Sequence, residues 1–289
     1  MSEYPMSEHP LTEYPLATSA LPSGRLAGLV GAVDRRLHLF QIGVQAGFHD
    51  YRRMFTWRSW LFGWALRLLA QVAFFASLGR LLGTPDSQDY IALGNAALLG
   101  PLGALGVVSS SAAERRAGTL PLLLLSRTGP LPVLAARGVY WVCDAMATAM
   151  LATALLPLIT GAALPPAALP GILGLEALAT LSCYALALAL TPVSMRFPES
   201  RGYLTSGLLI LMMLFSGVNT QPAEGPGGVV GAVLPMTHAL AGIRKLAAGG
   251  PLPGADLLGE LLVCGGWAAA AALLVPWGLR RAARAGALG

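Results

Sequence analysis

The sequence predicts an all-α membrane protein with six transmembrane helices, which follow an amphipathic helix that lies at the membrane interface. Apolar residues make up 55% of the 289 residues and charged residues only 11%, whereas soluble domains carry roughly 25% charged residues. The mean hydropathy of the whole chain is +0.64, which is more than a core of this size can hide from water. These observations exclude a water-soluble protein.

Six segments are long enough to cross a membrane. A transmembrane helix needs about 20 mainly apolar residues, because a rise of about 1.5 Å per residue has to cover roughly 30 Å of hydrocarbon. The fifth segment is short and has to stand nearly upright or include the turn that follows it. The predicted spans are 60–82, 91–113, 138–161, 167–191, 202–218 and 257–279.

The basic residues predict the orientation of these spans. Fifteen of the 19 basic residues fall on one face of the six-span arrangement, while Arg80, Arg244 and Lys245 fall on the other and Arg67 lies within a span. Because basic residues accumulate on the cytoplasmic side, both termini are predicted to be cytoplasmic. The excess of basic residues is therefore attributed to the orientation of the spans in the membrane, and no nucleic-acid partner is expected. The excess of Arg, Ala and Gly is typical of a GC-rich bacterial genome, so the expected location is the bacterial cytoplasmic membrane.

Two segments precede the spans. Residues 1–22 contain a pentad repeat with proline at every fifth position, which forbids a helix and predicts a disordered tail. Residues 23–55 predict an amphipathic interfacial helix, capped by Ser23 and supported by the membrane surface or by the bundle. Its apolar stripe recurs at steps of three and four residues and comprises Leu26, Val30, Val33, Leu37, Phe40 and Val44.

An apolar stretch between the last two spans, residues 229–248, resembles a seventh span in length. Pro235, His238, Arg244 and Lys245 interrupt it, and a seventh crossing would move the final arginines to the external side. The stretch is therefore predicted to form an external re-entrant pair of short helices broken near Pro235.

The loop between the second and third spans contains a short apolar helix. Thr119 is placed to cap this helix, Pro121 lies in its first turn, and Gly129 and Pro130 end it. A helix of about eight residues covers only about 12 Å, so leucines 122–125 cannot span the bilayer. Such an apolar patch on a cytoplasmic loop indicates contact with a membrane surface or with another protein.

Three stretches of the chain resemble the permease subunits of ABC exporters of the ABC-2 type. The loop resembles the family pattern Glu-Arg-x-x-Gly-Thr-Leu followed by leucines, although the family commonly has an acidic residue where this chain has Pro121. Residues 234–244 are similar to a proline-containing stretch ahead of an external arginine, and residues 90–94 to the entry of the second span. The matching loop residues are Glu114, Arg115, Gly118, Thr119 and Leu120.

The resemblance implies that the loop is a cytoplasmic coupling helix seated in a groove of a separate ABC ATPase subunit. Since the chain contains no Gly-x-x-x-x-Gly-Lys-Ser/Thr motif, ATP and magnesium are expected in that partner and no cofactor or catalytic residue in this chain. A second permease copy, or a related permease, is implied as well. The cargo is expected to be hydrophobic or amphipathic. The implied ATPase contacts are Glu114, Arg115, Gly118, Thr119, Leu120, Leu122 and Leu123.

Four ionisable residues lie within the predicted spans. Arg67 and Asp144 are both about 9–10 Å deep from the cytoplasmic side by helix rise, which allows them to form an intramembrane ion pair. Glu176 lies about 12–13 Å deep from the external side without a cation at its level, which makes it a candidate for the substrate path. Glu260 is expected to lie near the outer interface, in contact with solvent.

Two other classes of function remain as alternatives. An ion- or proton-coupled secondary transporter would use buried carboxylates such as Asp144 and Glu176, although the inverted repeats of many such transporters are not evident. A membrane-embedded enzyme is disfavoured, because neither His-Glu-x-x-His nor a Gly-x-Ser-Gly protease context occurs.

Overall fold

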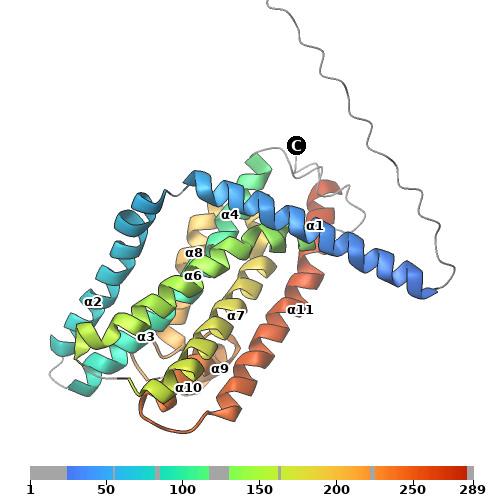
Figure 1. Cartoon of the computed structure of the whole chain (residues 1–289). Helices are drawn as coiled ribbons and strands as arrows, with labels where there is room; N and C mark the ends of the chain where they lie inside the picture. The colour runs from blue at the N-terminus through green and yellow to red at the C-terminus, as the bar shows by residue number, and fades with distance from the viewer. Residues whose placement is uncertain are drawn as a thin grey trace, which may run out of the picture.

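The computed structural model of the protein describes residues 25–54, 56–81, 85–116, 130–161, 164–221 and 225–284. All regular structure in these ranges is helical (Figure 1). The elements are α1 (Arg25–Met54), the π-helical η1 (Ser59–Ala65), α2 (Leu66–Leu81), α3 (Pro85–Ala104), α4 (Gly106–Arg116), α6 (Leu131–Thr160), η2 (Pro166–Ala168), α7 (Leu169–Arg196), η3 (Pro198–Ser200), α8 (Arg201–Phe215), α9 (Pro226–Val233), α10 (Thr237–Ala247) and α11 (Gly254–Arg284).

The described structure is all-helical, as predicted, and five of its helical segments are long and apolar enough to cross a membrane. The predicted fifth span, 202–218, contains the shorter helix α8, whose 15 residues cover only about 22 Å. An irregular stretch, 216–221, follows α8. The five segments are Ser59–Leu81, Ser87–Ser111, Leu131–Thr160, Pro166–Arg196 and Gly254–Arg281.

Helix α6 begins earlier than the sequence predicts. The third span was expected to start at residue 138, but the helix starts at Leu131, with Pro130 as its N-cap residue and Pro132 in its first turn. Proline is favoured in the first helical turn because its fixed φ suits the helix and its missing N–H is not needed there. The start of α6 therefore forms a helical extension ahead of the predicted span.

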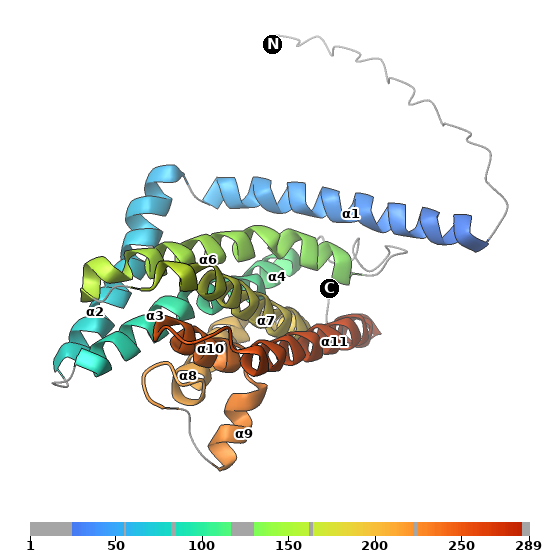
Figure 2. The same cartoon turned by 60° about the horizontal axis from the view of Figure 1, so that its bottom comes forward.

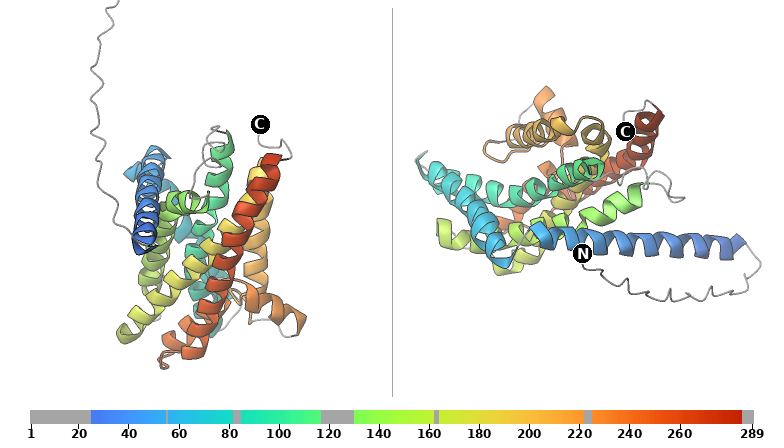
Figure 3. Two further views of the ribbon diagram at one scale, coloured as in Figure 1. Left: turned by 90° about the vertical axis from the view of Figure 1, so that its right-hand side faces the viewer. Right: turned by 90° about the horizontal axis from the view of Figure 1, so that it is seen from above.

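Helices α9 and α10 form a sharply bent pair. Their axes meet at 89° across residues 234–236, where Met236 adopts a left-handed backbone conformation with φ of 81°. The break coincides with the predicted one near Pro235. In two further views α9 projects away from the other helices (Figures 2 and 3).

The centre of the bundle is formed by α3 and α7. The most apolar stretch of the segment containing α3 is 89% buried, whereas that of α11 is 17% buried. Helices inside a membrane gain no hydrophobic energy by associating, so small residues that allow close packing replace large ones at their contacts. At Gly103 an added Cβ would lie 2.6 Å from the Cβ of Ala145 on α6. Gly103 therefore allows α3 and α6 to approach closely.

Helix α1 is strongly inclined to the bundle helices and runs along one end of the bundle (Figures 1 and 3). The last turns of α4, α7 and α11 lie at this same end, here called the α1 end, and α9 and α10 lie at the opposite end, called the α10 end (Figure 1). The topology thus separates two regions in which polar side chains gather.

Candidate functional site

The segment predicted to contact an ATPase falls largely outside the described residues. Glu114 and Arg115 belong to the last turn of α4, which ends at Arg116. Gly118, Thr119, Leu120, Leu122 and Leu123 fall within 117–129, which the structure does not describe. The helices that flank this segment, α4 and α6, both have their flanking ends at the α1 end (Figure 1).

Helix α1 is packed tightly onto the start of α6. An added Cβ at Gly43 would lie 2.6 Å from the Cβ of Ala136, and one at Gly47 would lie 2.6 Å from the carbonyl oxygen of Arg137. The guanidinium of Arg137 also forms an ion pair with Asp50, with 2.5 Å between Nη2 and Oδ2. Side chains at 43 and 47 would separate the helices, so the glycines that weaken α1 as an isolated helix are the residues that allow this contact.

Two side chains of the predicted apolar stripe of α1 are accessible beside this contact. Leu37 and Phe40, which belong to the predicted stripe, are 57% and 39% exposed, while Gly43 and Gly47 are buried against α6. The helix therefore uses its glycines against the bundle and leaves apolar side chains free to enter a membrane interface.

Asp144 accepts hydrogen bonds at the junction of α1, η1 and α6. The indole Nε1 of Trp60 donates to Asp144 Oδ1 at 2.5 Å, and the hydroxyl of Tyr51 interacts with the same carboxylate. The pKa of Tyr51 is raised well above its ordinary value, first by burial and then by its hydrogen bond to Asp144 and the negative charge of that side chain. Sequence reasoning missed both partners, because a tryptophan at the end of a span also fits a position among lipid headgroups.

The predicted ion pair of Arg67 and Asp144 stays a prediction. The backbone of Arg67 lies in α2, but its side chain falls outside the described part of the structure. Trp60 precedes Arg67 by seven residues, about 10 Å along the helix.

A double-mutant cycle measures this interaction. If Arg67 and Asp144 are paired away from water, Arg67→Leu or Asp144→Leu alone should each lower stability by about 3–5 kcal/mol, because each leaves an uncompensated charge. The double variant should then lose much less stability than the two single variants lose together. Thermal unfolding of the four purified proteins gives the coupling, and additive losses would show that the two side chains do not interact.

Glu176 is buried in the centre of the bundle. Its side chain is 1% exposed, and Thr153 on α6 donates its hydroxyl to Oε1. The second carboxyl oxygen, Oε2, has no hydrogen-bond partner, and among the described residues no basic side chain forms an ion pair with it. A buried carboxyl group with a free oxygen is costly unless it is protonated or meets a polar ligand.

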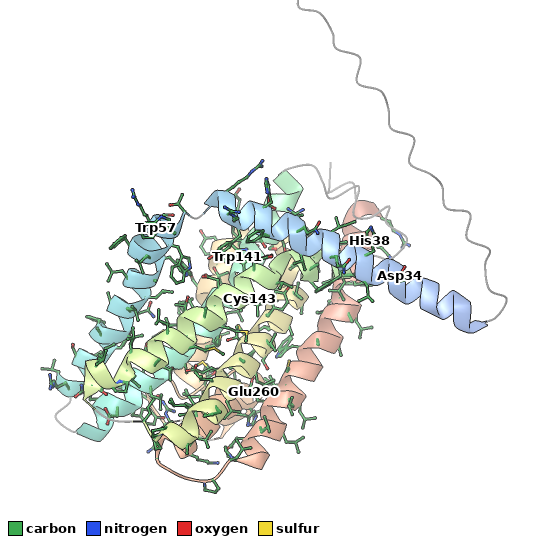
Figure 4. All side chains as sticks on the ribbon, in the orientation of Figure 1. Asp34, His38, Trp57, Trp141, Cys143 and Glu260 are labelled. Carbon is green, nitrogen blue, oxygen red and sulfur yellow. The ribbon has the colours of Figure 1, made fainter. Side chains whose placement is uncertain are left out.

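The prediction that Glu260 contacts solvent is wrong. Its side chain is 0% exposed, its Oε1 accepts from the backbone N–H of Met236 at 3.0 Å, and its Oε2 accepts from that of Ala239 at 3.1 Å. The first N–H groups of a helix lack partners within the helix and carry partial positive charge. The carboxylate on α11 therefore caps α10 and stabilises the bend between α9 and α10, and Figure 4 shows Glu260 far from the α1 end.

Arg244 connects two of the stretches that carry the family resemblance. Its guanidinium lies over the ring of Tyr90, 3.4 Å from the centroid, and donates to the carbonyl oxygens of Tyr90 at 3.2 Å and Val218 at 3.1 Å. The hydroxyl of Tyr90 donates to the carbonyls of Gly217 and Thr220. Residues 90–94, 216–220 and 234–244 thus meet at the α10 end.

No group of three His, Cys, Asp or Glu side chains within the described ranges is arranged to hold a metal ion. Comparisons of the chain with protein-family models, with curated proteins and with solved structures found no match.

Proposed function

We propose that this chain is the membrane-spanning permease subunit of an ATP-driven exporter of the ABC-2 type. It would move a hydrophobic or amphipathic small molecule, a peptide or a lipid-like cargo out of the cytoplasm. The observation that carries the proposal is the loop with Glu114, Arg115 and Gly118–Leu120, in which an apolar run too short to span a membrane follows the family pattern.

The packing of α1 supports a docking site for an ATPase at the α1 end. The docking segment is followed directly by the start of α6, which is joined to α1 through Gly47 and through the ion pair of Asp50 and Arg137. A movement of the docking segment would therefore displace α6 and α1 together. Arginines 280, 281 and 284 on the last turns of α11 fit a cytoplasmic location of this end in a bacterial membrane.

The α10 end supports an external re-entrant pair. The pair α9–α10 is bent by 89°, and two backbone N–H groups at the start of α10 donate to Glu260 within the protein. Non-helical backbone at membrane depth requires such internal partners. With α8 counted as the short fifth of six spans, both termini lie on the cytoplasmic side, and a second permease copy or a related permease completes the transporter.

The decisive test is purification with and without a partner ATPase. The chain alone should hydrolyse no ATP, whereas the ATPase encoded beside it should co-purify with it, and cargo transport into inverted vesicles should require ATP. A complex whose ATPase lacks its nucleotide-binding lysine serves as the control and should bind but not transport. Transport that persists without any ATPase and follows a proton gradient would contradict the proposal.

The second candidate is a proton- or ion-coupled transporter that uses Asp144 and Glu176. The unpaired Oε2 of Glu176 favours it, because a buried carboxyl group with one free oxygen can take up and release a proton. This candidate expects a protonophore to abolish transport and Glu176→Gln to remove the dependence on the proton gradient. An exporter driven by a partner ATPase would keep transporting under the same protonophore.

A further inference from the structure

A pocket of about 440 Å³ lies where α1, η1 and α6 meet at the α1 end. Figure 4 shows two of its residues, Trp57 and Cys143, on the side of the bundle that α1 follows. Its lining comprises Tyr51, Thr56, Trp57, Trp60, Tyr140, Cys143 and Asp144. Residues far apart in the sequence therefore build one site, to which α1 contributes.

Aromatic rings form most of the walls of this pocket. Two tyrosines and two tryptophans line it, and the rings of Tyr51 and Tyr140 lie 6.4 Å apart with an angle of 27° between their planes. The face of an aromatic ring is negative and attracts cations, and boxes of such rings bind alkylated ammonium groups. The walls are therefore suited to a cation that carries apolar groups.

Among the described residues that line the pocket, Asp144 supplies the one carboxylate. Its carboxylate accepts hydrogen bonds from the side chains of Trp60 and Tyr51. A single carboxylate among rings disfavours an anion, and it offers too few oxygens for calcium or magnesium. A cationic ammonium group can pair electrostatically with the carboxylate while its carbon substituents contact the rings.

We propose that this pocket binds an organic ammonium group. The inference does not depend on the exporter proposal, because it rests only on the rings and on Asp144. Two sources share the chemistry: the headgroup of an ethanolamine lipid and a free amphipathic amine. Trp57 is 68% exposed and has the guanidinium of Arg58 over its ring at 5.3 Å, so a basic group for a lipid phosphate stands beside the pocket.

Cys143 provides a direct readout, because it lines the pocket and is exposed whereas Cys183 is buried. In a Cys264→Ala background of the full chain in detergent, the rate of maleimide labelling reports access to the pocket. Saturating butyltrimethylammonium should slow labelling at least about tenfold, while butanesulfonate of the same length and sodium chloride should not. Equal rates with all three additives would overturn the proposal.

Variants identify which side chains of the pocket bind the ammonium group. Asp144→Asn should weaken protection by butyltrimethylammonium about tenfold or more, and Trp57→Leu should weaken it without touching the carboxylate. Glu199→Gln changes an exposed acid outside the pocket and should leave protection unchanged. Full protection in both pocket variants would overturn the proposal. Protection that appears only when Arg67→Leu is introduced would also overturn the proposal, because Arg67 would then occupy the carboxylate of Asp144 in the native protein.

Reconstitution into lipid nanodiscs distinguishes an ethanolamine lipid from a free amine as the source of the ammonium group. If an ethanolamine lipid fills the pocket, Cys143 should be labelled more slowly in phosphatidylethanolamine than in phosphatidylglycerol, and the soluble probe should add little protection in the former. If the ligand is a free amine, the two lipids should give equal rates and the probe should slow labelling in both. Either pattern supports the site, and no protection by lipid or probe contradicts it.

Discussion

Replacing Glu260 by Gln should destabilise the protein by about 3 kcal/mol. The amide keeps one acceptor for the start of α10 and turns an NH₂ group toward the other backbone N–H, so one of the bonds to Met236 and Ala239 is lost. A buried donor without an acceptor costs about 1–3 kcal/mol, and a bond to a charged acceptor is worth more than a neutral one. The favourable interaction of the carboxylate with the helix dipole is lost as well.

A matched control lies one turn earlier on the same helix. Asp256 pairs with Lys245 at 2.6 Å in a surface salt bridge, in which the lysine is 58% and the aspartate 14% exposed, and surface pairs contribute at most about 1 kcal/mol. Asp256→Asn should therefore lower the melting temperature of the detergent-solubilised protein much less than Glu260→Gln. Equal shifts in the two variants would mean that the cap on α10 contributes little to stability.

The class of fold could be predicted from the sequence because it depends on composition and segment length. Apolar runs of about 20 residues form helices in a membrane whatever their partners, since every backbone group has to be satisfied within the helix. The break near Pro235 was predictable for a similar reason, because proline and charged residues interrupt such a run. The start of α6 was not, since its first turns lie ahead of the apolar run that defined the predicted span.

The partners of polar side chains could not be predicted. Depth along a helix suggested that Glu260 is solvated, but burial depends on which neighbour covers that face of α11, and α10 covers it by bending back. Likewise, Trp60 and Tyr51 meet Asp144 only because α1 turns along the end of the bundle. Hydropathy gives the position of a residue along the membrane normal and contains no information on the rotation of its helix.

A single charge in the docking segment should separate the permease from its ATPase. In the proposed exporter, Leu122 and Leu123 enter an apolar groove of the partner, where an aspartate loses its hydration without gaining a hydrogen bond. Burying a polar group in that way costs about 2–7 kcal/mol, which corresponds to a loss of affinity of roughly thirtyfold or more. Leu122→Asp and Leu123→Asp should therefore abolish co-purification and stimulated ATP hydrolysis.

Membrane insertion of both variants should be unchanged, because the apolar spans are untouched. Leu252→Asp is the control, since Leu252 is an exposed leucine, 61% accessible, in the non-helical stretch before α11 at the α10 end. The Leu252→Asp variant should bind the ATPase and stimulate ATP hydrolysis as the unmodified chain does. If both docking variants do the same, the leucines rest on lipid instead of protein, and the loop with Glu114 and Arg115 loses its role as the contact that transmits ATP hydrolysis to the membrane helices.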